Sequence, residues 1–145
     1  MLEQRPIKDM IRSIIHDPVF LGQPSAPATE DDLPVAADLC DTLRANLDRC
    51  VGMAANMIGV RKRIIAVSEG PAIIVMLNPK IIQKSGEYEA EEGCLSLQGV
   101  RKVTRFRSIQ LSWQDCMMKT HIGFLNGFRA QIVQHEIDHC DGILI

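Results

Sequence analysis

The sequence predicts an α+β fold in which antiparallel or mixed strands pack around a central helix that carries an H-E-x-x-H motif. Strand-like segments follow one another in the middle of the chain, and helical periodicity is found near both ends. Because strands and helices do not alternate regularly, a doubly wound sheet is disfavoured. The length of 145 residues suits a single domain, residues 1–145, with its own hydrophobic core.

Composition excludes several classes of function. The formal net charge of −2 gives no electrostatic reason to expect direct nucleic-acid binding. No segment approaches the ~18 apolar residues that a membrane-spanning helix needs. The five cysteines are odd in number and irregularly spaced, which indicates free thiols and a reducing compartment. The charged N-terminus does not resemble a secretory signal, so we expect a cytoplasmic protein without membrane contact.

Two helices are predicted before the first strand. Apolar residues recur at helical spacing over residues 7–15, and Pro18 lies just beyond that helix. A second helix is predicted over residues 33–48, with Thr29 or Asp31 as its cap.

The middle of the chain has strand character. Residues 50–59 are small, apolar and uncharged, and they predict a tight backbone passage followed by a buried turn or edge. Residues 64–67 and 73–77 are predicted strands, and Asn78 and Pro79 close the second one.

The remaining elements complete the predicted sheet and add a helix. Residues 81–83 continue the sheet after a bend, and residues 85–87 form a turn. Apolar and polar residues alternate over residues 109–113, which is typical of a half-buried strand. Residues 126–139 predict a final helix that ends near Gly142.

The last helix contains the sequence His-Glu-Ile-Asp-His at residues 135–139. On a helix, His135 and His139 project to the same side, where two imidazoles can converge on one metal ion. Glu136 is then placed to take a proton from water. From these residues alone, two solvated histidines remain the alternative. The apolar flanks favour burial, and buried imidazoles need a polar partner such as a metal.

A catalytic metal site needs a third protein ligand. Only six residues follow His139, so this ligand is expected upstream. His16, His121 and the cysteines are candidates. Cys94 stands out because Gly93 before it permits a close backbone approach. Its alternative role is that of a small buried apolar residue.

Three segments together resemble the peptide deformylase family. They are EGCLS at residues 92–96, QHEIDH at residues 134–139 and VGMAAN at residues 51–56, which matches most of the family's first motif. Their order and spacing agree with the family, and the similarity covers essentially the whole chain. The resemblance implies an enzyme that removes the N-formyl group from the N-terminal Met of nascent polypeptides and releases formate.

The resemblance also implies a set of functional residues. Cys94, His135 and His139 would bind one divalent metal, with Fe(II) expected in the cell and Zn(II) or Ni(II) able to replace it. Glu136 would act as general base and then as general acid. The backbone N–H of Leu95 would help to hold the oxyanion.

The same resemblance assigns the substrate cleft and the partners. Gly52, Glu92 and Gly93 would line the cleft that receives the N-formylated peptide. Arg101 is a candidate for binding the substrate backbone or carboxylate, with a solvated residue in a basic run as its alternative. A transient ribosome contact is expected not to use the long C-terminal extension of some bacterial members, which is missing after residue 145.

Two positions depart from the family's first motif. Cys50 stands where the motif begins with Gly, and Met57 stands where it closes with Gln. In the family that Gln donates a hydrogen bond to the formyl oxygen, and Met cannot donate one. Loss of one oxyanion donor typically reduces the rate by ~10²–10³. We therefore expect reduced activity, with two alternatives: another metal-dependent amidase or peptidase, or a non-catalytic binding protein. The presence of Glu136 argues against a pure binder.

Overall fold

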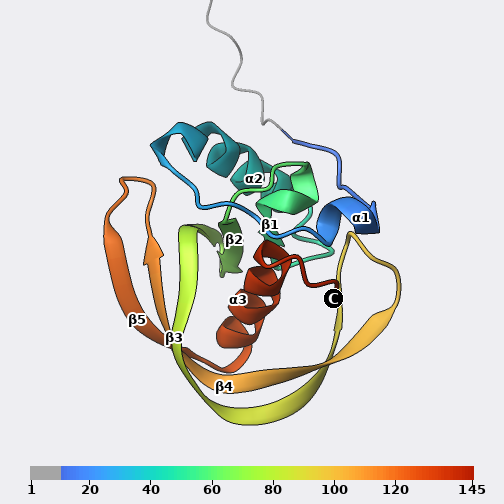
Figure 1. Ribbon diagram of the computed structural model, residues 1–145, viewed down its shortest axis with the longest axis vertical. Helices are drawn as coiled ribbons and strands as arrows, with labels where there is room; N and C mark the ends of the chain where they lie inside the picture. The colour runs from blue at the N-terminus through green and yellow to red at the C-terminus, as the bar shows by residue number, and fades with distance from the viewer. Residues whose placement is uncertain (1–10) are drawn as a thin grey trace, which may run out of the picture.

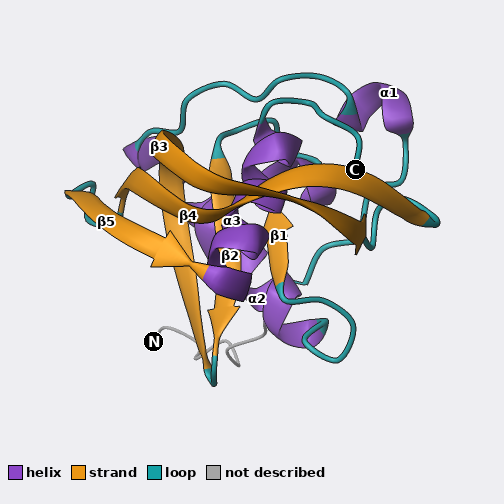
Figure 2. Ribbon diagram, turned by 90° about the horizontal axis from the view of Figure 1, so that it is seen from below, coloured by secondary structure: helices purple, strands orange, loops and turns teal. Residues whose placement is uncertain are grey.

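The computed structural model describes residues 11–145 and contains one five-stranded sheet with its helices in this part of the chain. The strand order is β1-β2-β3-β4-β5, and every neighbouring pair is antiparallel. The predicted α+β class is thus confirmed (Figures 1 and 2). The α-helices are α1 (Pro18–Leu21), α2 (Leu33–Ala45) and α3 (Gly127–Cys140), and the 3₁₀ turns are η1 (Glu30–Asp32) and η2 (Ala55–Ile58). The strands are β1 (Gly52–Ala54), β2 (Ile64–Glu69), β3 (Ala72–Gly93), β4 (Val100–Gln114) and β5 (Thr120–Asn126).

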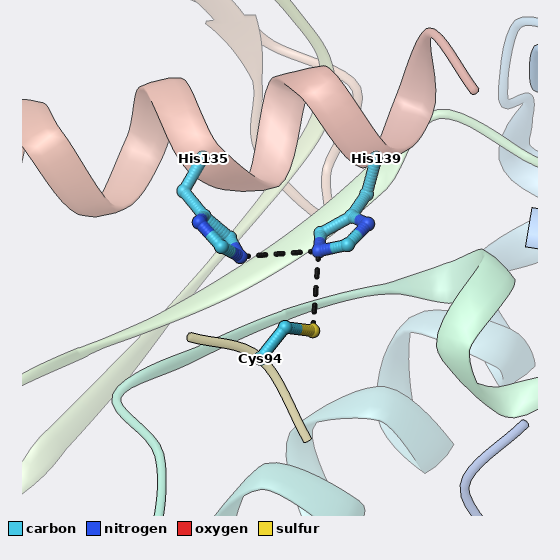
Figure 3. A group of neighbouring side chains, drawn as sticks. All are labelled: Cys94, His135 and His139. Atoms are coloured by element: carbon cyan, nitrogen blue, oxygen red, sulfur yellow. Dashed lines mark hydrogen bonds between the residues drawn. The ribbon is translucent and has the colours of Figure 1, made fainter. Parts of the chain in front are cut away.

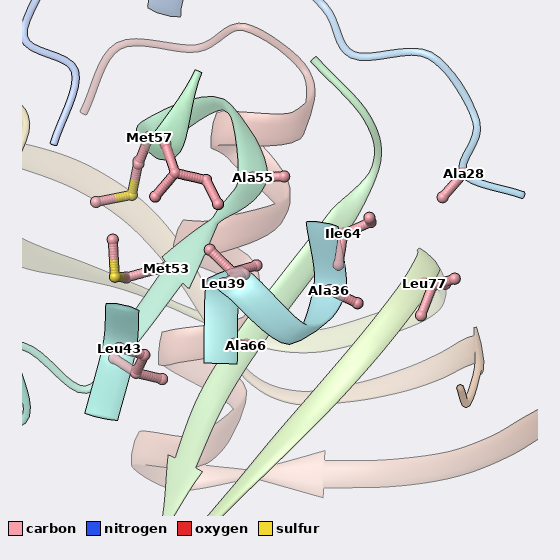
Figure 4. Close-up of a cluster of buried hydrophobic side chains, with 11 residues drawn as sticks. Ala28, Ala36, Leu39, Leu43, Met53, Ala55, Met57, Ile64, Ala66 and Leu77 are labelled. Atoms are coloured by element: carbon pink, nitrogen blue, oxygen red, sulfur yellow. The ribbon is translucent and has the colours of Figure 1, made fainter. Parts of the chain in front are cut away.

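Strand β2 is apolar on both faces because helices cover both of them. Ile64 and Ala66 pack into a cluster with residues of α2 and η2, part of which Figure 4 shows. Ile65 and Val67 belong to a second cluster with residues of α3. Successive side chains of a strand point to opposite faces, so an uninterrupted apolar run is what a strand between two helices requires.

Strands β3 and β4 form a long ribbon that curves around α3 (Figure 1). The predicted strand end at Asn78 and the predicted turn at residues 85–87 are therefore wrong, because β3 continues through both. β3 pairs with β4 both before and after Asn78, and the register of this pairing shifts between Leu77 and Lys80. Gly86 adopts φ +79°, and a Cβ there would lie 3.0 Å from the Cβ of Arg107.

The helix predicted over residues 7–15 is wrong for residues 11–15, and its earlier part lies outside the described residues. The segment instead bonds to distant backbone and side-chain groups. Arg12 N–H donates to Thr42 Oγ1 at 3.0 Å, and Ile15 N–H donates to the Met57 carbonyl at 2.8 Å. These tertiary contacts outweigh the local apolar periodicity.

Several other boundaries differ in smaller ways. Helix α2 begins at the predicted residue but ends at Ala45, and Thr29 caps the 3₁₀ turn η1 that precedes it. Strand β4 includes predicted residues 109–113 but starts at Val100, and β5 was not among the predicted strands. The passage after Cys50 does form an edge strand and a buried turn, as expected.

Helix α3 agrees with the prediction to within a residue at each end, and it contacts β1, β2, β4 and β5. Its C-terminal half is buried on nearly every side, although it contains the polar residues Gln134, His135, Glu136 and His139. Buried polar groups are costly unless they are paired. The groups that pair with these buried polar side chains therefore indicate where the functional site lies.

Candidate metal centre and catalytic cleft

Two imidazoles and one thiol converge beneath α3. His135 and His139 project from the same side of the helix toward Cys94, which follows β3 directly (Figure 3). The two Nε2 atoms lie 3.1 Å apart, and Cys94 Sγ lies 3.3 Å from His139 Nε2. All three ligand atoms fall within 4.8 Å of one another, and no other such group of three occurs within residues 11–145.

The structure does not bring the other third-ligand candidates into this group. The ring of His16 instead contacts the Ser96 carbonyl, and the ring of His121 contacts Asp115. Ser96 also matters to Cys94, because its backbone N–H approaches the Cys94 sulfur at 3.5 Å.

A buried network of charged groups orients His135. Glu92 accepts hydrogen bonds from His135 Nδ1 at 2.8 Å, from Arg105 at 2.9 and 2.7 Å, and from Gln131 at 2.9 Å. Arg105 also donates to Asp138 at 2.7 Å. Burial opposes ionisation of Glu92, but these hydrogen bonds outweigh it and lower its pKa to about 2. Because Nδ1 donates to Glu92, Nε2 is the His135 nitrogen that would bind a metal once its proton is lost.

The two histidines have pKa values shifted in opposite directions. Burial and the neighbouring His135 lower the pKa of His139 to about 3. Burial also disfavours charge on His135, but interactions with Cys94 and Glu92 outweigh it and raise its pKa to about 10. A cation bound here would displace the His135 proton and face two neutral imidazoles. The residues present therefore fit a divalent metal.

Glu136 lies beside this group, and its side chain is buried. It is only 4% exposed, and burial raises its pKa to about 7. Its Oε1 atom is buried without a hydrogen-bond partner among the described residues. Gly52 permits this packing, because a Cβ there would lie 3.0 Å from Glu136 Oε2 and 2.8 Å from Ile132 Cγ2. A carboxylate whose pKa lies near neutrality can both accept and donate a proton.

A cleft of about 650 Å³ opens onto these groups. The predicted residues Gly52, Glu92, Gly93 and Leu95 all line it, together with Glu136. Arg101, the remaining residue predicted for the substrate cleft, does not line this cleft. Arg101 lies opposite Glu92 in the β3–β4 register and donates to the Gln98 carbonyl at 3.4 Å.

The two positions that depart from the family motif also face the cleft. Met57 lines it although the residue is only 1% exposed, and its sulfur accepts a 3.5 Å contact from Ala54 N–H. Cys50 is partly buried in the cleft wall, and burial together with nearby Glu136 raises its pKa to about 11. The thiol of Cys50 is therefore protonated at neutral pH, unlike a metal-ligating thiol.

Sequence reasoning missed Gln131 and Arg105, which donate to Glu92, and Asp138, which accepts from Arg105. Gln131 precedes His135 by one helical turn, and Asp138 lies inside the H-E-x-x-H motif, so helical spacing could have suggested both. Arg105 gave no local signal, because strand pairing brings it to Glu92 across the β3–β4 ribbon. A buried arginine almost always has acidic partners, but its burial is visible only in the fold.

The fold and the site together define the class. A thiol and two imidazoles that converge on one point beside a buried carboxylate, in an open cleft, form the arrangement of a metal-dependent hydrolase.

Comparisons with known proteins identify the family. The family model described as polypeptide deformylase matches residues 11–145. The peptide deformylase of Clostridium beijerinckii is 52% identical over 136 residues, which are 94% of this chain and 100% of that relative. The crystal structure of peptide deformylase from Thermotoga maritima is similar, with a TM-score of 0.83, 27% identity, and coverage of 92% of this chain and 94% of that one. A peptide deformylase structure from Legionella pneumophila gives a TM-score of 0.82 and 34% identity, with coverage of 92% and 83%. The chain belongs to the polypeptide deformylase family.

Membership confirms the predicted activity. The chain is a deformylase, a hydrolase that acts on peptides with N-terminal N-formyl-methionine, and its family is metal-dependent. Within residues 11–145, no helix has both the length and the apolar character needed to cross a membrane.

Proposed function

We propose that Cys94, His135 and His139 bind one divalent metal ion, and that Glu136 is the proton-transfer residue of deformylation. The convergence of the three ligand atoms within 4.8 Å, beside buried Glu136, carries this proposal. The hydrogen bond from His135 to Glu92 supports it, because such a contact fixes the tautomer that a metal requires. When bound, the ion supplies Lewis acidity and lowers the pKa of water.

The chain's own residues then perform the remaining steps. Glu136 takes a proton from the attacking water and later delivers it to the leaving amine, so that formate and a free N-terminus result. The Leu95 N–H donates to the formyl oxygen as negative charge develops there. Gly52 and Gly93 form the cleft wall, and Glu92 keeps His135 oriented. We propose Arg101 as a contact for the substrate backbone beyond the cleft.

The three ligand atoms also indicate which metals the site can bind. We propose Fe(II) as the ion used in the cell, with Zn(II) or Ni(II) as functional replacements, because one thiolate and two imidazoles suit all three. Metal analysis of anaerobically purified protein tests this, and we expect close to one iron per chain. If the anaerobically purified protein contains another metal and no iron, Fe(II) is not the ion used in the cell.

The substrate class suggests where the enzyme works. We propose a cytoplasmic enzyme, residues 1–145 forming a single domain, that contacts the ribosome transiently while the nascent N-terminus is exposed. Sedimentation with ribosomes that carry formyl-methionyl nascent chains tests the contact. Empty ribosomes are the control, and equal recovery of enzyme with both would contradict a contact that depends on the nascent chain.

Formate release from formyl-Met-Ala-Ser tests the role of Glu136. We expect Glu136→Gln to reduce kcat by about 10²–10⁴, because Gln cannot carry the proton. The matched control is Glu89→Gln, which makes the same change at an exposed residue of β3 and should leave kcat unchanged. Metal content is measured in all three proteins. If Glu136→Gln binds metal normally and keeps its activity, the proposed role of Glu136 is wrong.

A further inference from the structure

We propose that His16 is a positioning residue for deformylation, which holds the loop that carries Leu95 at the correct distance from the substrate's formyl oxygen. The inference rests on the proposed role of the Leu95 N–H as an oxyanion donor. It concerns the extended segment of residues 12–16, which lies outside the cleft. This segment contacts the turn that carries Met57 and the loop that carries Leu95.

One end of this segment is anchored on α2. The Arg12 guanidinium donates two hydrogen bonds to Asp38 Oδ2, at 2.9 and 2.6 Å. The Arg12 backbone N–H donates to Thr42 Oγ1 at 3.0 Å. A charge-assisted pair with two donors fixes orientation as well as distance. The start of the segment is therefore held on the helix.

The middle of the segment contacts the turn that carries Met57. The Ile15 N–H donates to the Met57 carbonyl at 2.8 Å. Ile14 packs against the hydrophobic cluster that includes Met57 and is also contacted by Leu95. Residues 14 and 15 therefore contact the part of the cleft wall that contains Met57.

The end of the segment holds that loop. His16 Nδ1 lies 2.9 Å from the Ser96 carbonyl oxygen. A carbonyl oxygen can only accept, so Nδ1 carries the hydrogen and donates. The Ser96 N–H in turn approaches Cys94 Sγ at 3.5 Å. With its carbonyl held by His16 and its N–H near Cys94 Sγ, Ser96 cannot rotate without breaking a contact. Leu95 lies in the chain between Cys94 and Ser96, so these contacts also restrict its backbone.

Such a link matters for catalysis because oxyanion donors act over a narrow range of distance. A donor must lie about 2.7–3.1 Å from the developing oxyanion. A misplacement of ~1 Å can reduce a rate ~10²-fold. Met57 contributes no side-chain donor, so correct placement of the Leu95 N–H is more important in this chain than in relatives that have Gln at that position.

The experiment compares three holoenzyme variants on formyl-Met-Ala-Ser and on the product Met-Ala-Ser. We expect His16→Ala to lower kcat by about fivefold, the usual effect of losing one hydrogen bond, with KM unchanged. Inhibition by Met-Ala-Ser should also be unchanged, because the product has no formyl oxygen. His16→Asn should restore most of kcat, since its amide can donate from nearly the same place as Nδ1. His121→Ala, which removes a hydrogen-bonded histidine in the β4–β5 hairpin, is the control and should resemble the wild type.

Two results would overturn the inference. One is a His16→Ala enzyme with wild-type kcat. The other is a fall in kcat accompanied by lower metal content or by weaker Met-Ala-Ser binding, which would show that His16 only supports the folded site. Failure of the proposed function is distinguishable, because Glu136→Gln would then bind metal and keep its activity, whatever the result for His16→Ala.

Discussion

Met57 stands in the cleft where the family's first motif closes with Gln. Its side chain is buried, lines the cleft and contacts the Ala54 N–H through sulfur. A Gln side chain has nearly the same length, and its amide oxygen could accept from the same N–H while its NH₂ group donates into the cleft. The position is therefore suited to a donor that this chain lacks.

Replacement of Met57 by Gln should increase deformylase activity. We expect Met57→Gln to raise kcat/KM on formyl-Met peptides by about tenfold or more, because it restores an oxyanion donor. Met57→Leu is the control for a change of shape without a donor, and it should give no increase. An unchanged or lower kcat/KM in Met57→Gln would show that the Met57 position does not limit the reaction.

The Glu92–Arg105 ion pair contributes to the stability of the fold and also contacts His135 of the proposed metal site through Glu92. Both side chains are almost fully buried, at 5% exposure for Arg105 and 7% for Glu92. We expect Arg105→Met to lower the free energy of unfolding by about 3–5 kcal/mol, because it leaves a buried carboxylate without its charge partner. Metal affinity should also fall about 10–100-fold, since Glu92 orients His135.

Denaturant unfolding and metal titration measure these two effects. The matched control is Arg129→Met, which breaks the half-exposed Arg129–Glu69 pair and should cost at most about 1 kcal/mol. Equal losses of stability in the two variants would mean that the buried network contributes no more than a surface ion pair.

Single residues differed in how well the sequence predicted their role. Helical spacing alone placed His135, Glu136 and His139 on one site. Cys94 needed the family motif, because nothing local separates a ligand from a buried thiol. Arg105 and His16 contact partners that only the fold brings near, at separations of 13 and 80 residues. No local pattern encodes such contacts.

At the level of elements, the final helix and the sheet were predicted better than the turns. Asn78, Pro79 and Gly86 are residues typical of turns, yet β3 passes through all of them. Continuous pairing with β4 supplies the hydrogen bonds that a turn would otherwise provide. The predicted helix at residues 7–15 is wrong in its described part, residues 11–15, for a similar reason, since tertiary hydrogen bonds outweigh the apolar periodicity there.

The C-terminal end of α3 depends on Gly142. This glycine has φ +74°, and a Cβ there would lie 2.7 Å from the backbone carbon of Gln23. The Ile143 N–H returns to the Asp138 carbonyl at 2.9 Å and closes the helix one turn beyond His135. A side chain at position 142 would therefore displace the backbone next to the helical turn that carries His139.

We expect Gly142→Ala to lower the free energy of unfolding by about 3 kcal/mol, from left-handed strain and backbone overlap together. Gly70→Ala is the control, because Gly70 also has positive φ (+58°) but no atom lies within 4 Å of an added Cβ. It should cost only the ~1–2 kcal/mol of left-handed strain. Thermal or urea unfolding measures the difference, and equal losses would show that the overlap at Gly142 is relieved at no cost.

At the scale of the whole molecule, the sheet brings distant segments to one point. The end of β3, the edge strand β1 and the middle of α3 meet at the cleft, and the two hydrophobic clusters flank them. The sequence predicted the α+β class and the family, because three motifs are linked in order. It did not predict the curvature of the β3–β4 ribbon around α3, which arises from pairing over most of two long strands (Figure 1).

X-ray absorption spectroscopy of the zinc-loaded protein tests most directly whether Cys94, His135 and His139 are the metal ligands. We predict one sulfur at about 2.3 Å and two imidazole nitrogens at about 2.0–2.1 Å from the metal. In Cys94→Ser the sulfur shell should disappear while the imidazole signal remains. A wild-type spectrum without sulfur, or a Cys94→Ser spectrum that still contains it, would contradict the assignment of Cys94, His135 and His139.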